Sequence, residues 1–399
     1  LQAGMHHDGM QFFPFSEHGK PSSTHGLLCI NHEYTDDGLL HVEGMQNWSA
    51  EKVAKSKAAT GVSVIEVRKD GDEWQVVRPS SFARRISADT PCRVAGPARA
   101  HPSMITAADR RGELVLGTLN NCAMRHTPWG TYLTCEENFN GYFKGPKVPS
   151  ADQKRYGFTE SGFGFRWHEF DERFDLTLHP NEGNRFGWVV EIDPRSPDKA
   201  PVKRTALGRF KHEGASVTLA ADGRVVVYMG DDERFEYIYK FVSRETYIPG
   251  VSDTDRLLDE GTLYVARFSD DGKGQWLPLR LGEKFPGGSL NAENGFRNQG
   301  DVLIRCRQAA DIAAATKMDR PEWIAVHPKN GEVYVTLTNN SKRGNTPGGD
   351  VNAANPRAEN IFGHIIRWRE YAQNAASTSF NWEIFALAGD PQHPDENKR

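Results

Sequence analysis

Residues 127–138 read TPWGTYLTCEEN, a turn followed directly by a short strand. Pro128 fixes its own φ angle and Gly130 tolerates a positive φ, so the first residues are typical of a tight turn. Residues 131–134 then alternate β-branched side chains with aromatic or apolar ones, which is the pattern of a β-strand. The stretch therefore predicts a strand that leaves a turn and runs straight into polar residues.

The end of this strand carries a thiol and two carboxylates, on Cys135, Glu136 and Glu137. Two carboxylates beside a thiol are costly to gather unless a cation neutralises them. A thiolate suits a transition metal, whereas carboxylate and amide oxygens suit calcium or magnesium. Taken alone, the stretch favours a simpler interpretation, a free cysteine beside a solvated acidic turn, because charged residues are usually exposed.

The same design recurs along the chain. Residues 26–33 read GLLCINHE, residues 223–233 read GRVVVYMGDDE, and residues 331–340 read GEVYVTLTNN. Glu213 and Glu322 lie ten and nine positions ahead of the opening glycines of the last two stretches. Repeated strand units that cannot bury themselves alone indicate a propeller or a solenoid. In a propeller the innermost strands line a channel, so we expect these polar strand ends to converge there around one or more cations.

Length and composition exclude several classes of protein. The 399 residues suit two or three domains or one large propeller, and we predict a single all-β propeller domain over residues 1–399 with helical and loop insertions. A formal net charge of −4 argues against nucleic acid as the main partner and against a polybasic membrane surface. Five cysteines without a CxxC or His-spaced pattern leave at least one thiol free or bound to a metal, and zinc is not favoured.

Hydrophobic alternation predicts strands along most of the chain. The predicted strands are 26–34, 62–69, 73–78, 131–134, 186–192, 215–219, 224–229, 236–242, 262–268, 275–281, 323–327, 332–337, 361–368 and 380–387. The turn Asp70-Gly71-Asp72 predicts a hairpin. Residues 45–60 and 309–318 are the predicted helices.

The segments between these elements are predicted to be irregular. Residues 79–112 are interpreted as a long connection, and residues 139–185 and 338–359 as insertions or loops. In residues 1–25, His6, His7 and Asp8 are either ligands or part of a flexible, glycine-flanked loop over a site.

The chain contains neither the GxSxG motif of a serine nucleophile nor the P-loop and GxGxxG motifs that bind nucleotides. Any chemistry is therefore expected to use water or hydroxide activated by a metal. Arg320 is a candidate for binding an anion through its guanidinium. The alternative interpretation is that Arg320 forms a surface ion pair with Asp319. His32 and His212, each followed by a Glu, are interpreted as packed groups beside ligands.

The chain resembles the PhoX-type alkaline phosphatases at motifs that follow one another over nearly its whole length. The motifs are HHDGMQFFP, NHEY, TPWGTYLTCEENFNGYF, RFGWVVEID, KHEGA, YMGDDERFEYIYKF, LDEGTLYVARF and RPEWIAVHP. TPWGTYLTCEEN is very specific to that family, and the others are moderately specific.

The resemblance implies a β-propeller whose channel holds Fe3+ and Ca2+, and a phosphomonoesterase that uses a metal-bound oxygen nucleophile. Cys135 would bind iron through its thiolate. The implied oxygen ligands to iron or calcium are Asn31, Glu33, Glu136, Glu213, Asp231 and Glu322. Arg320 would hold the substrate phosphate and serve in catalysis.

The resemblance also implies a location and a partner. Family members are exported, so we expect a periplasmic or extracellular monomer, although no export signal precedes Leu1. The expected partners are small-molecule phosphate monoesters, with no nucleic acid and no membrane insertion. Family chains continue past residues 385–391, whereas this one ends at Arg399, so either the sequence is trimmed or the ring closes differently.

Two other functions fit the acidic strand ends. One is a calcium-dependent lactonase or phosphotriesterase on a propeller, and the other is a binding propeller with structural calcium. Neither needs a thiolate or a phosphate-clamping arginine, so Cys135 and Arg320 discriminate against both.

Overall fold

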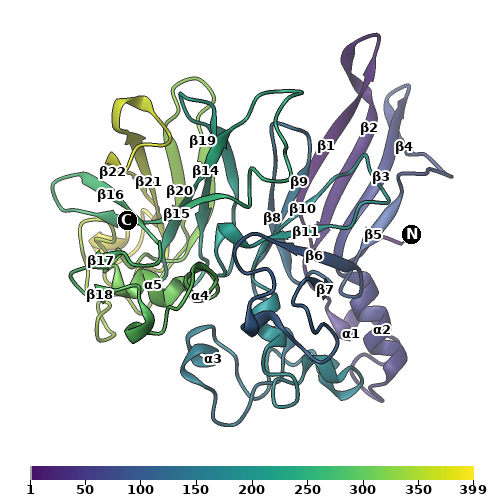
Figure 1. Ribbon diagram of the computed structural model, residues 1–399, viewed down its shortest axis with the longest axis horizontal. Helices are drawn as coiled ribbons and strands as arrows, with labels where there is room; N and C mark the ends of the chain where they lie inside the picture. The colour runs from purple at the N-terminus through teal and green to yellow at the C-terminus, as the bar shows by residue number, and fades with distance from the viewer. Residues whose placement is uncertain (1) are drawn as a thin grey trace. The chain divides into compact units, whose positions relative to one another are not determined.

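The computed structural model describes residues 2–399 and divides the chain into two compact units (Figure 1). Unit 1 extends to Ala95 and continues from Arg99 to Arg204, whereas unit 2 comprises Gly96–Ala98 and Thr205–Arg399. Both units are built mainly from strands, so the prediction of a mostly β fold is confirmed.

The first sheet of unit 1 has the order β1–β2–β3–β4. Strand β4 pairs with the second half of β3, and β5 pairs with its first half. Its strands are β1 (His7–Glu17), β2 (Lys20–His32), β3 (Gly61–Asp70), β4 (Glu73–Val76) and β5 (Arg84–Ile86). Asp70 lies opposite Glu73, which confirms the predicted hairpin. The flexible loop predicted in residues 1–25 is wrong, because β1 is a long strand whose Phe13 is buried and pairs with Leu27.

The second sheet of unit 1 has the order β7–β6–β11–β10–β9–β8. Its strands are β6 (Pro91–Ala95), β7 (Leu114–Leu116), β8 (Asn121–His126), β9 (Tyr132–Glu136), β10 (Val189–Ile192) and β11 (Val202–Arg204). The predicted long connection at 79–112 is wrong, since it contains β5 and β6. The two sheets share a core to which Phe13 and Val64 contribute from one side and Tyr132 and Val190 from the other.

Short helices complete unit 1. They are α1 (Asp37–Leu40), α2 (Ala50–Ala59), α3 (Ala151–Arg155) and the 3₁₀ turns η1 (Pro102–Met104), η2 (Phe139–Tyr142), η3 (Trp167–Glu169), η4 (Glu172–Phe174) and η5 (Glu182–Arg185). Helix α2 lies inside the predicted range and begins after Ser49, whose side chain accepts a hydrogen bond from the Lys52 N–H. Residues 139–185, all of which the structure describes, contain helical turns and no strand.

Unit 2 is dominated by one sheet of nine strands in the order β12–β13–β14–β15–β16–β22–β21–β20–β19. The strands are β12 (Ser216–Leu219), β13 (Arg224–Gly230), β14 (Ile238–Thr246), β15 (Gly261–Phe268), β16 (Lys273–Pro278), β19 (Pro321–Val326), β20 (Val333–Leu337), β21 (His364–Glu370) and β22 (Ser379–Leu387). Each strand predicted between 215 and 387 is present. The end strands β12 and β19 also pack against each other, so the sheet is nearly closed.

The remaining elements of unit 2 are small. They are β17 (Lys284–Phe285), β18 (Gly288–Ser289), α4 (Gln299–Ile304), α5 (Cys306–Ile312), η6 (Thr205–Leu207), η7 (Ala292–Asn294), η8 (Tyr371–Gln373) and η9 (Glu396–Lys398). The helix predicted at 309–318 begins and ends earlier than expected, because Ala314 has a φ of +52°, outside the helical region.

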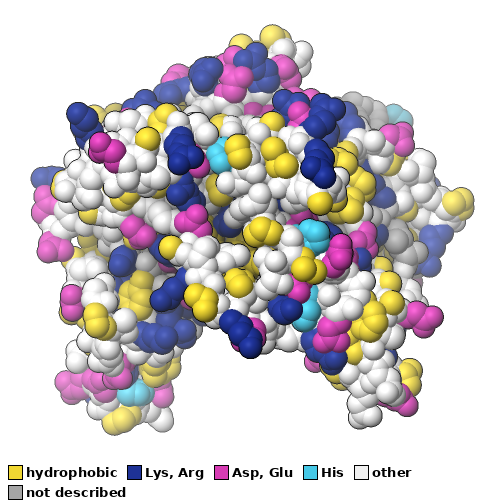
Figure 2. Space-filling view, turned by 60° about the horizontal axis from the view of Figure 1, so that its bottom comes forward, with side chains coloured by type: hydrophobic (Ala, Val, Ile, Leu, Met, Phe, Trp, Pro, Cys, Tyr) yellow, Lys and Arg dark blue, Asp and Glu magenta, His cyan; other side chains and the backbone are white. Residues whose placement is uncertain are grey.

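The described residues include no helix with the length and apolar content needed to cross a bilayer. Figure 2 shows Lys and Arg side chains interspersed with Asp and Glu side chains over the visible face. Such mixing matches the small net charge of the sequence.

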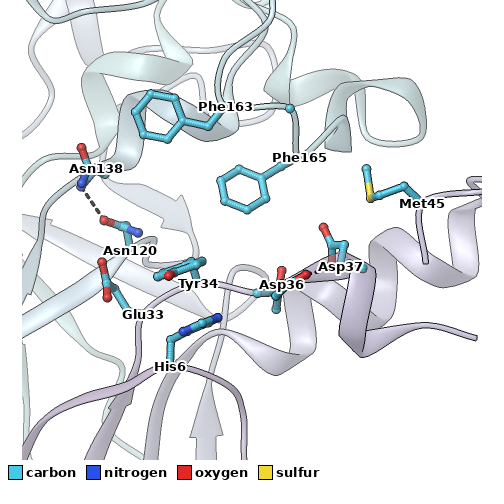
Figure 3. A pocket seen from close by; sticks show the side chains of 13 residues that line it. His6, Glu33, Tyr34, Asp36, Asp37, Met45, Asn120, Asn138, Phe163 and Phe165 are labelled. Atoms are coloured by element: carbon cyan, nitrogen blue, oxygen red, sulfur yellow. Dashed lines mark hydrogen bonds between the residues drawn. The ribbon is translucent and has the colours of Figure 1, made fainter.

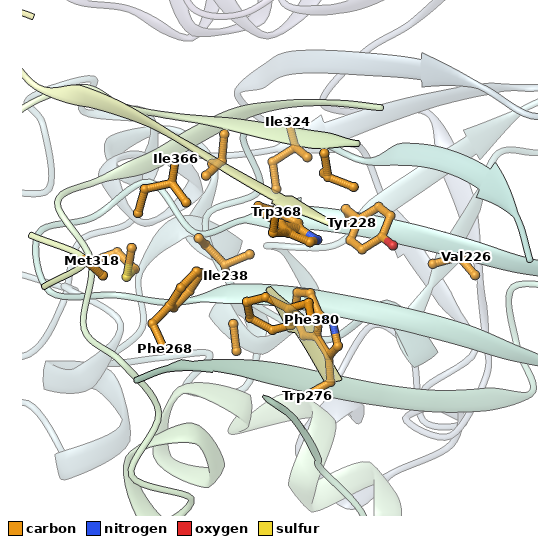
Figure 4. Packing of buried hydrophobic residues seen from close by; sticks show 14 of the residues in the cluster. Val226, Tyr228, Ile238, Phe268, Trp276, Met318, Ile324, Ile366, Trp368 and Phe380 are labelled. Carbon is orange, nitrogen blue, oxygen red and sulfur yellow. The ribbon is translucent and has the colours of Figure 1, made fainter. Parts of the chain in front are cut away.

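Aromatic side chains form the centre of the unit 2 core (Figure 4). The ring centroids of Trp276 lie 5.9 Å from Trp368 and 5.1 Å from Phe380. One carboxylate, Glu370, is buried among them and accepts hydrogen bonds from Tyr228 Oη at 2.8 Å and from Trp276 Nε1 at 3.0 Å. These donors compensate part of the cost of placing a carboxylate in the core.

The cation opposite Glu370 is Lys240, whose side chain is fully buried. Its Nζ lies 3.2 Å from Glu370 Oε1 and also donates to the carbonyls of Ala375 and Ser377. Burial lowers the pKa of Lys240 to about 8, although the charge of Glu370 opposes that shift. Burial likewise raises the pKa of Glu370, so each ion depends on the other.

We predict that Glu370→Ala lowers the free energy of unfolding by about 3–5 kcal/mol, because it leaves the Lys240 ammonium buried without a counterion. Urea denaturation measures this change. The matched control is Glu383→Ala in the same sheet, where a half-exposed carboxylate pairs with Arg367. That control should cost less than about 1 kcal/mol. Equal losses in the two variants would contradict the role assigned to the buried pair.

Candidate active site

Three metal-binding side chains meet in unit 1 and are named here the thiol cluster: Asp8, Glu33 and Cys122. One ligand atom from each lies within 4.8 Å of the other two, and the Cys122 thiol is 3.1 Å from Asp8 Oδ2. Asp8 lies near the start of β1, Glu33 follows the end of β2, and Cys122 lies on β8. The chemistry of this donor set, a thiol with two carboxylates, fits a transition metal such as iron.

Antiparallel pairing explains why Asp8 and Glu33 are neighbours. His7 lies opposite His32, so the start of β1 meets the end of β2. The Glu33 N–H then donates to the His6 carbonyl at 3.0 Å, which extends the pairing by one residue. The strand that ends in NHE thus delivers its carboxylate beside Asp8.

A β-bulge in β8 explains how Cys122 joins them. Asn121 pairs with Glu136 and Met124 pairs with Thr134, so Cys122 and Ala123 together lie opposite the single residue Cys135. A bulge of this kind locally re-aims side chains relative to the regular alternation. Cys122 is buried, and its position next to Asp8 follows from this irregularity.

Three carboxylates meet in unit 2 and are named here the acidic cluster: Glu213, Asp232 and Glu322. Their ligand oxygens lie within 4.8 Å of one another. Asp232 follows the end of β13, Glu322 lies on β19, and the Glu213 N–H donates to the Gly230 carbonyl at 3.2 Å. An all-oxygen donor set with a threefold negative charge fits calcium.

Arg320 contacts the acidic cluster directly. Its Nε and Nη2 donate to the two oxygens of Asp232 at 2.9 and 2.8 Å, and Nη2 lies 3.3 Å from Glu322 Oε1. Burial alone would lower the pKa of Arg320, but the hydrogen bonds with Asp232 together with the charges of Asp232, Glu322 and Glu213 raise it. The residue has a φ of +56°, which is uncommon outside glycine and is often found at functional sites.

The alternative ion pair between Arg320 and Asp319 is wrong. Asp319 is fully buried and accepts from Arg343 Nε at 2.8 Å, and also from Asn340 and Asn360. Its charge is thus neutralised by a different guanidinium, while Arg320 binds Asp232.

Asn31, expected as an oxygen ligand, instead ties strands together. Its Oδ1 accepts from Tyr132 Oη at 2.9 Å and from Thr134 Oγ1 at 3.0 Å, and its Nδ2 donates to the Cys122 carbonyl at 2.5 Å. The amide oxygen is therefore already engaged by two hydroxyls. We interpret Asn31 as a residue that positions Cys122 rather than as a ligand.

Cys135 and Glu136, the centre of the opening motif, are buried, and neither belongs to either cluster. Cys135 pairs with Val189 of β10, and no group of three metal-binding side chains found among residues 2–399 includes it. Glu136 accepts from Lys203 Nζ at 2.6 Å and from the Gly187 N–H at 2.9 Å. Lys203 is itself fully buried, so this pair neutralises Glu136 inside unit 1.

Asp232, and not the expected Asp231, belongs to the acidic cluster. Both oxygens of Asp231 accept from Arg307, at 2.7 and 2.5 Å, and the pair is buried. Adjacent residues of an extended chain point in opposite directions, so only one of the two can face the acidic cluster. That residue is Asp232.

The two histidines behave as packed groups, as predicted. His32 Nε2 lies 2.7 Å from Ser63 Oγ, and His212 Nε2 donates to the Gly208 carbonyl at 2.9 Å. Burial lowers the pKa of each to about 3, so both rings are neutral at pH 7.

Sequence reasoning thus placed Glu33, Glu213, Glu322 and Arg320 at the clusters and missed Cys122 and Asp232. For Asp8 the sequence left two possibilities open, a metal ligand or part of a flexible loop over a site. For Asp232 a signal existed, namely the alternation of side chains along a strand end. For Cys122 no signal in the sequence marks the bulge.

Comparison with known proteins agrees with this geometry. A family model described as "Alkaline phosphatase PhoX" matches residues 1–399. A solved structure of Pseudomonas fluorescens PhoX in complex with vanadate, a transition state analogue, is 49% identical, with a TM-score of 0.94 over 100% of this chain and 69% of that chain. Among curated proteins, no relative matches the sequence. Because the family model spans all 399 residues, the chain belongs to the PhoX alkaline phosphatase family.

Proposed function

We propose that this chain releases inorganic phosphate from small organic phosphate monoesters, with metal ions held at the thiol cluster and the acidic cluster. The observation that carries the proposal is Arg320, a guanidinium held at a group of three carboxylates. Such an arrangement suits an anionic substrate bound at a cation. The vanadate complex of the Pseudomonas relative supports it, because vanadate imitates the phosphoryl group in transfer.

We propose Fe3+ for the thiol cluster and Ca2+ for the acidic cluster. The thiolate of Cys122 favours a transition metal, and the oxygens of Glu213, Asp232 and Glu322 favour a hard cation. Bound cations would neutralise the charge that develops on the phosphoryl oxygens. The proposed ligands are therefore Asp8, Glu33, Cys122, Glu213, Asp232 and Glu322.

Arg320 is the proposed phosphate-binding residue. Its Nε and Nη2 hold Asp232 as a fork, which fixes the plane of the guanidinium. Nη1 has no partner among the described residues and presents two further N–H donors. A substrate phosphate that accepts from Nη1 would gain a charge-assisted hydrogen bond at a preorganised position.

We also propose a propeller fold and a periplasmic or extracellular location for this chain. The meanders β13–β16 and β19–β22 each contain four antiparallel strands, as a propeller blade does, which supports a propeller. Family membership supports a periplasmic or extracellular location. A single domain over residues 1–399 and a monomeric state stay predictions.

We predict that Cys122→Ser loses bound iron, together with any visible colour that arises from iron–thiolate charge transfer. Elemental analysis and absorption spectra of the purified variant measure both. Cys135→Ser is the matched control, because it removes a buried thiol outside the thiol cluster. Loss of iron in Cys135→Ser, with iron kept in Cys122→Ser, would restore Cys135 as the ligand.

Arg320→Ala should lower kcat/KM for a chromogenic phosphate monoester about a hundredfold, as expected when one charged donor is lost from a preorganised site. Arg320→Lys should recover only part of this, because lysine lacks the planar fork that holds Asp232. Metal content should be unchanged in both variants, whereas Glu322→Gln should lose metal and activity together. Arg256→Ala, an exposed arginine of unit 2, is the control. Full activity in Arg320→Ala would refute the clamp.

Removal of calcium by a chelator should lower the melting temperature, because carboxylates without a cation repel one another and a ligand of the native state stabilises it. Thermal melting with and without the chelator tests this expectation. The shift should be smaller in Glu322→Gln, which lacks one carboxylate of the acidic cluster. An unchanged midpoint in the wild-type protein would show that calcium contributes nothing to stability.

A further inference from the structure

A cavity of about 520 Å³ in unit 1 adjoins the thiol cluster, because Glu33 belongs to both (Figure 3). Its volume is that of a site for a small organic molecule. All of its lining residues belong to unit 1. They come from the segment after β2, the loop around residue 164, and the residues just before β1, β8 and η2. The cavity therefore extends from Glu33 away from Asp8 and Cys122.

Aromatic rings form two facing walls of the cavity. On one side Tyr34 stacks on His6, with ring centroids 3.8 Å apart and planes inclined by 8°. On the other side Figure 3 shows Phe163 and Phe165 directed toward the space above Tyr34. A flat ring placed between these walls would meet aromatic faces on both sides.

The rings of the second wall are held in place by their surroundings. Phe165 stacks on Tyr142, with centroids 4.4 Å apart and planes inclined by 8°. The Phe163 N–H donates to the Gly141 carbonyl at 2.8 Å, and its ring occupies the space beside Gly141, where a Cβ would lie only 2.3 Å away. Phe163 nevertheless remains 55% exposed, so one face of its ring is available to a ligand.

The remaining charge of the cavity is negative. Glu33, Asp36 and Asp37 line it, and none of its described lining residues is Lys or Arg. Asp37 Oδ1 accepts from Ser56 Oγ at 2.6 Å and lies 3.3 Å from His41 Nε2, and Asp36 accepts from the Gly38 N–H at 2.9 Å. Neither carboxylate pairs with a Lys or Arg of the described residues. A second negative charge on a ligand would therefore be repelled here.

We propose that this cavity receives the alcohol part of the phosphate ester and favours flat aromatic groups that carry no negative charge. The inference rests on the part of the proposed function that assigns a cation to the thiol cluster, since a phosphate ester bound at that cation would place its organic part in the adjoining cavity. The aromatic walls supply affinity, and the carboxylates supply discrimination against anionic alcohols.

The first test compares 2-naphthyl phosphate with glycerol 2-phosphate in the wild-type enzyme and in Phe163→Ala. The ratio of their kcat/KM values should fall about two- to tenfold in the variant, in line with the loss of one aromatic contact. The comparison of ratios cancels the intrinsic reactivity of each ester. Phe170→Ala is the matched control, because Phe170 is a half-exposed aromatic of unit 1 that does not line the cavity.

A binding measurement separates recognition from catalysis. The fluorescence of 2-naphthol reports its affinity for the holoenzyme, and we expect Phe163→Ala to weaken this affinity about two- to tenfold. Phe170→Ala should bind 2-naphthol as the wild type does. Equal affinities in all three proteins would overturn the proposed role of the cavity.

The charge of the cavity is tested with a pair of aromatic esters, 4-carboxyphenyl and 4-carbamoylphenyl phosphate. The wild type should prefer the uncharged ester, and Asp36→Asn should reduce this preference about threefold, as expected for one charge roughly 6 Å away in water. Asn caps a helix as well as Asp does, so α1 should keep its N-cap. Asp72→Asn, at an exposed turn of unit 1, should leave the preference unchanged.

The outcomes distinguish this inference from the function on which it rests. If the enzyme hydrolyses every ester and Phe163→Ala changes neither the ratio nor the naphthol affinity, the cavity's role is refuted and the phosphatase stands. If no ester releases phosphate, the proposed function fails, and the naphthol titration still decides whether the cavity binds aromatic groups.

Discussion

A carboxylate stays buried in a protein only if a positive charge or a set of N–H donors replaces its water. Several carboxylates of this chain meet that condition within the protein, as Glu136 does with Lys203 and Asp231 does with Arg307. The acidic cluster differs, since three carboxylates lie close together and two of them, Asp232 and Glu322, contact the guanidinium of Arg320. Carboxylates gathered this closely would favour a bound cation, and the roles proposed for the cluster residues depend on that cation.

Strand pairing brings the cluster residues together from distant parts of the sequence. The thiol cluster depends on the antiparallel register of β1 and β2 and on the bulge in β8, which places Cys122 beside Asp8. The acidic cluster depends on the end of β13, where the Gly230 carbonyl accepts from the Glu213 N–H. In the thiol cluster's surroundings, Asn31 of β2 adds a buried link to β9 and β8 through its hydrogen bonds with Tyr132 Oη and the Cys122 carbonyl. The geometry of each cluster thus depends on how strands pair and on where they end.

One carboxylate, Asp232, connects the two tasks assigned to unit 2. It belongs to the group that would hold a cation, and it also orients the guanidinium of Arg320. A cation that draws negative charge from Asp232 would change the strength of its fork with Arg320. Metal binding and phosphate binding would therefore be coupled through a shared side chain rather than through a conformational change.

The sequence by itself determined the nine strands of the large sheet of unit 2, the Asp70-Gly71-Asp72 hairpin and the family, because period-two alternation, turn glycines and contiguous motifs are local properties of the chain. It also placed acidic residues at strand ends. It missed β1, β5, β6 and β8 of unit 1. Only the tertiary structure decided that Cys122 rather than Cys135 joins the carboxylates and that Asp232 rather than Asp231 faces Glu322. Side-chain direction depends on bulges and on partners such as Lys203 and Arg307, which come from far along the chain and which no local pattern specifies.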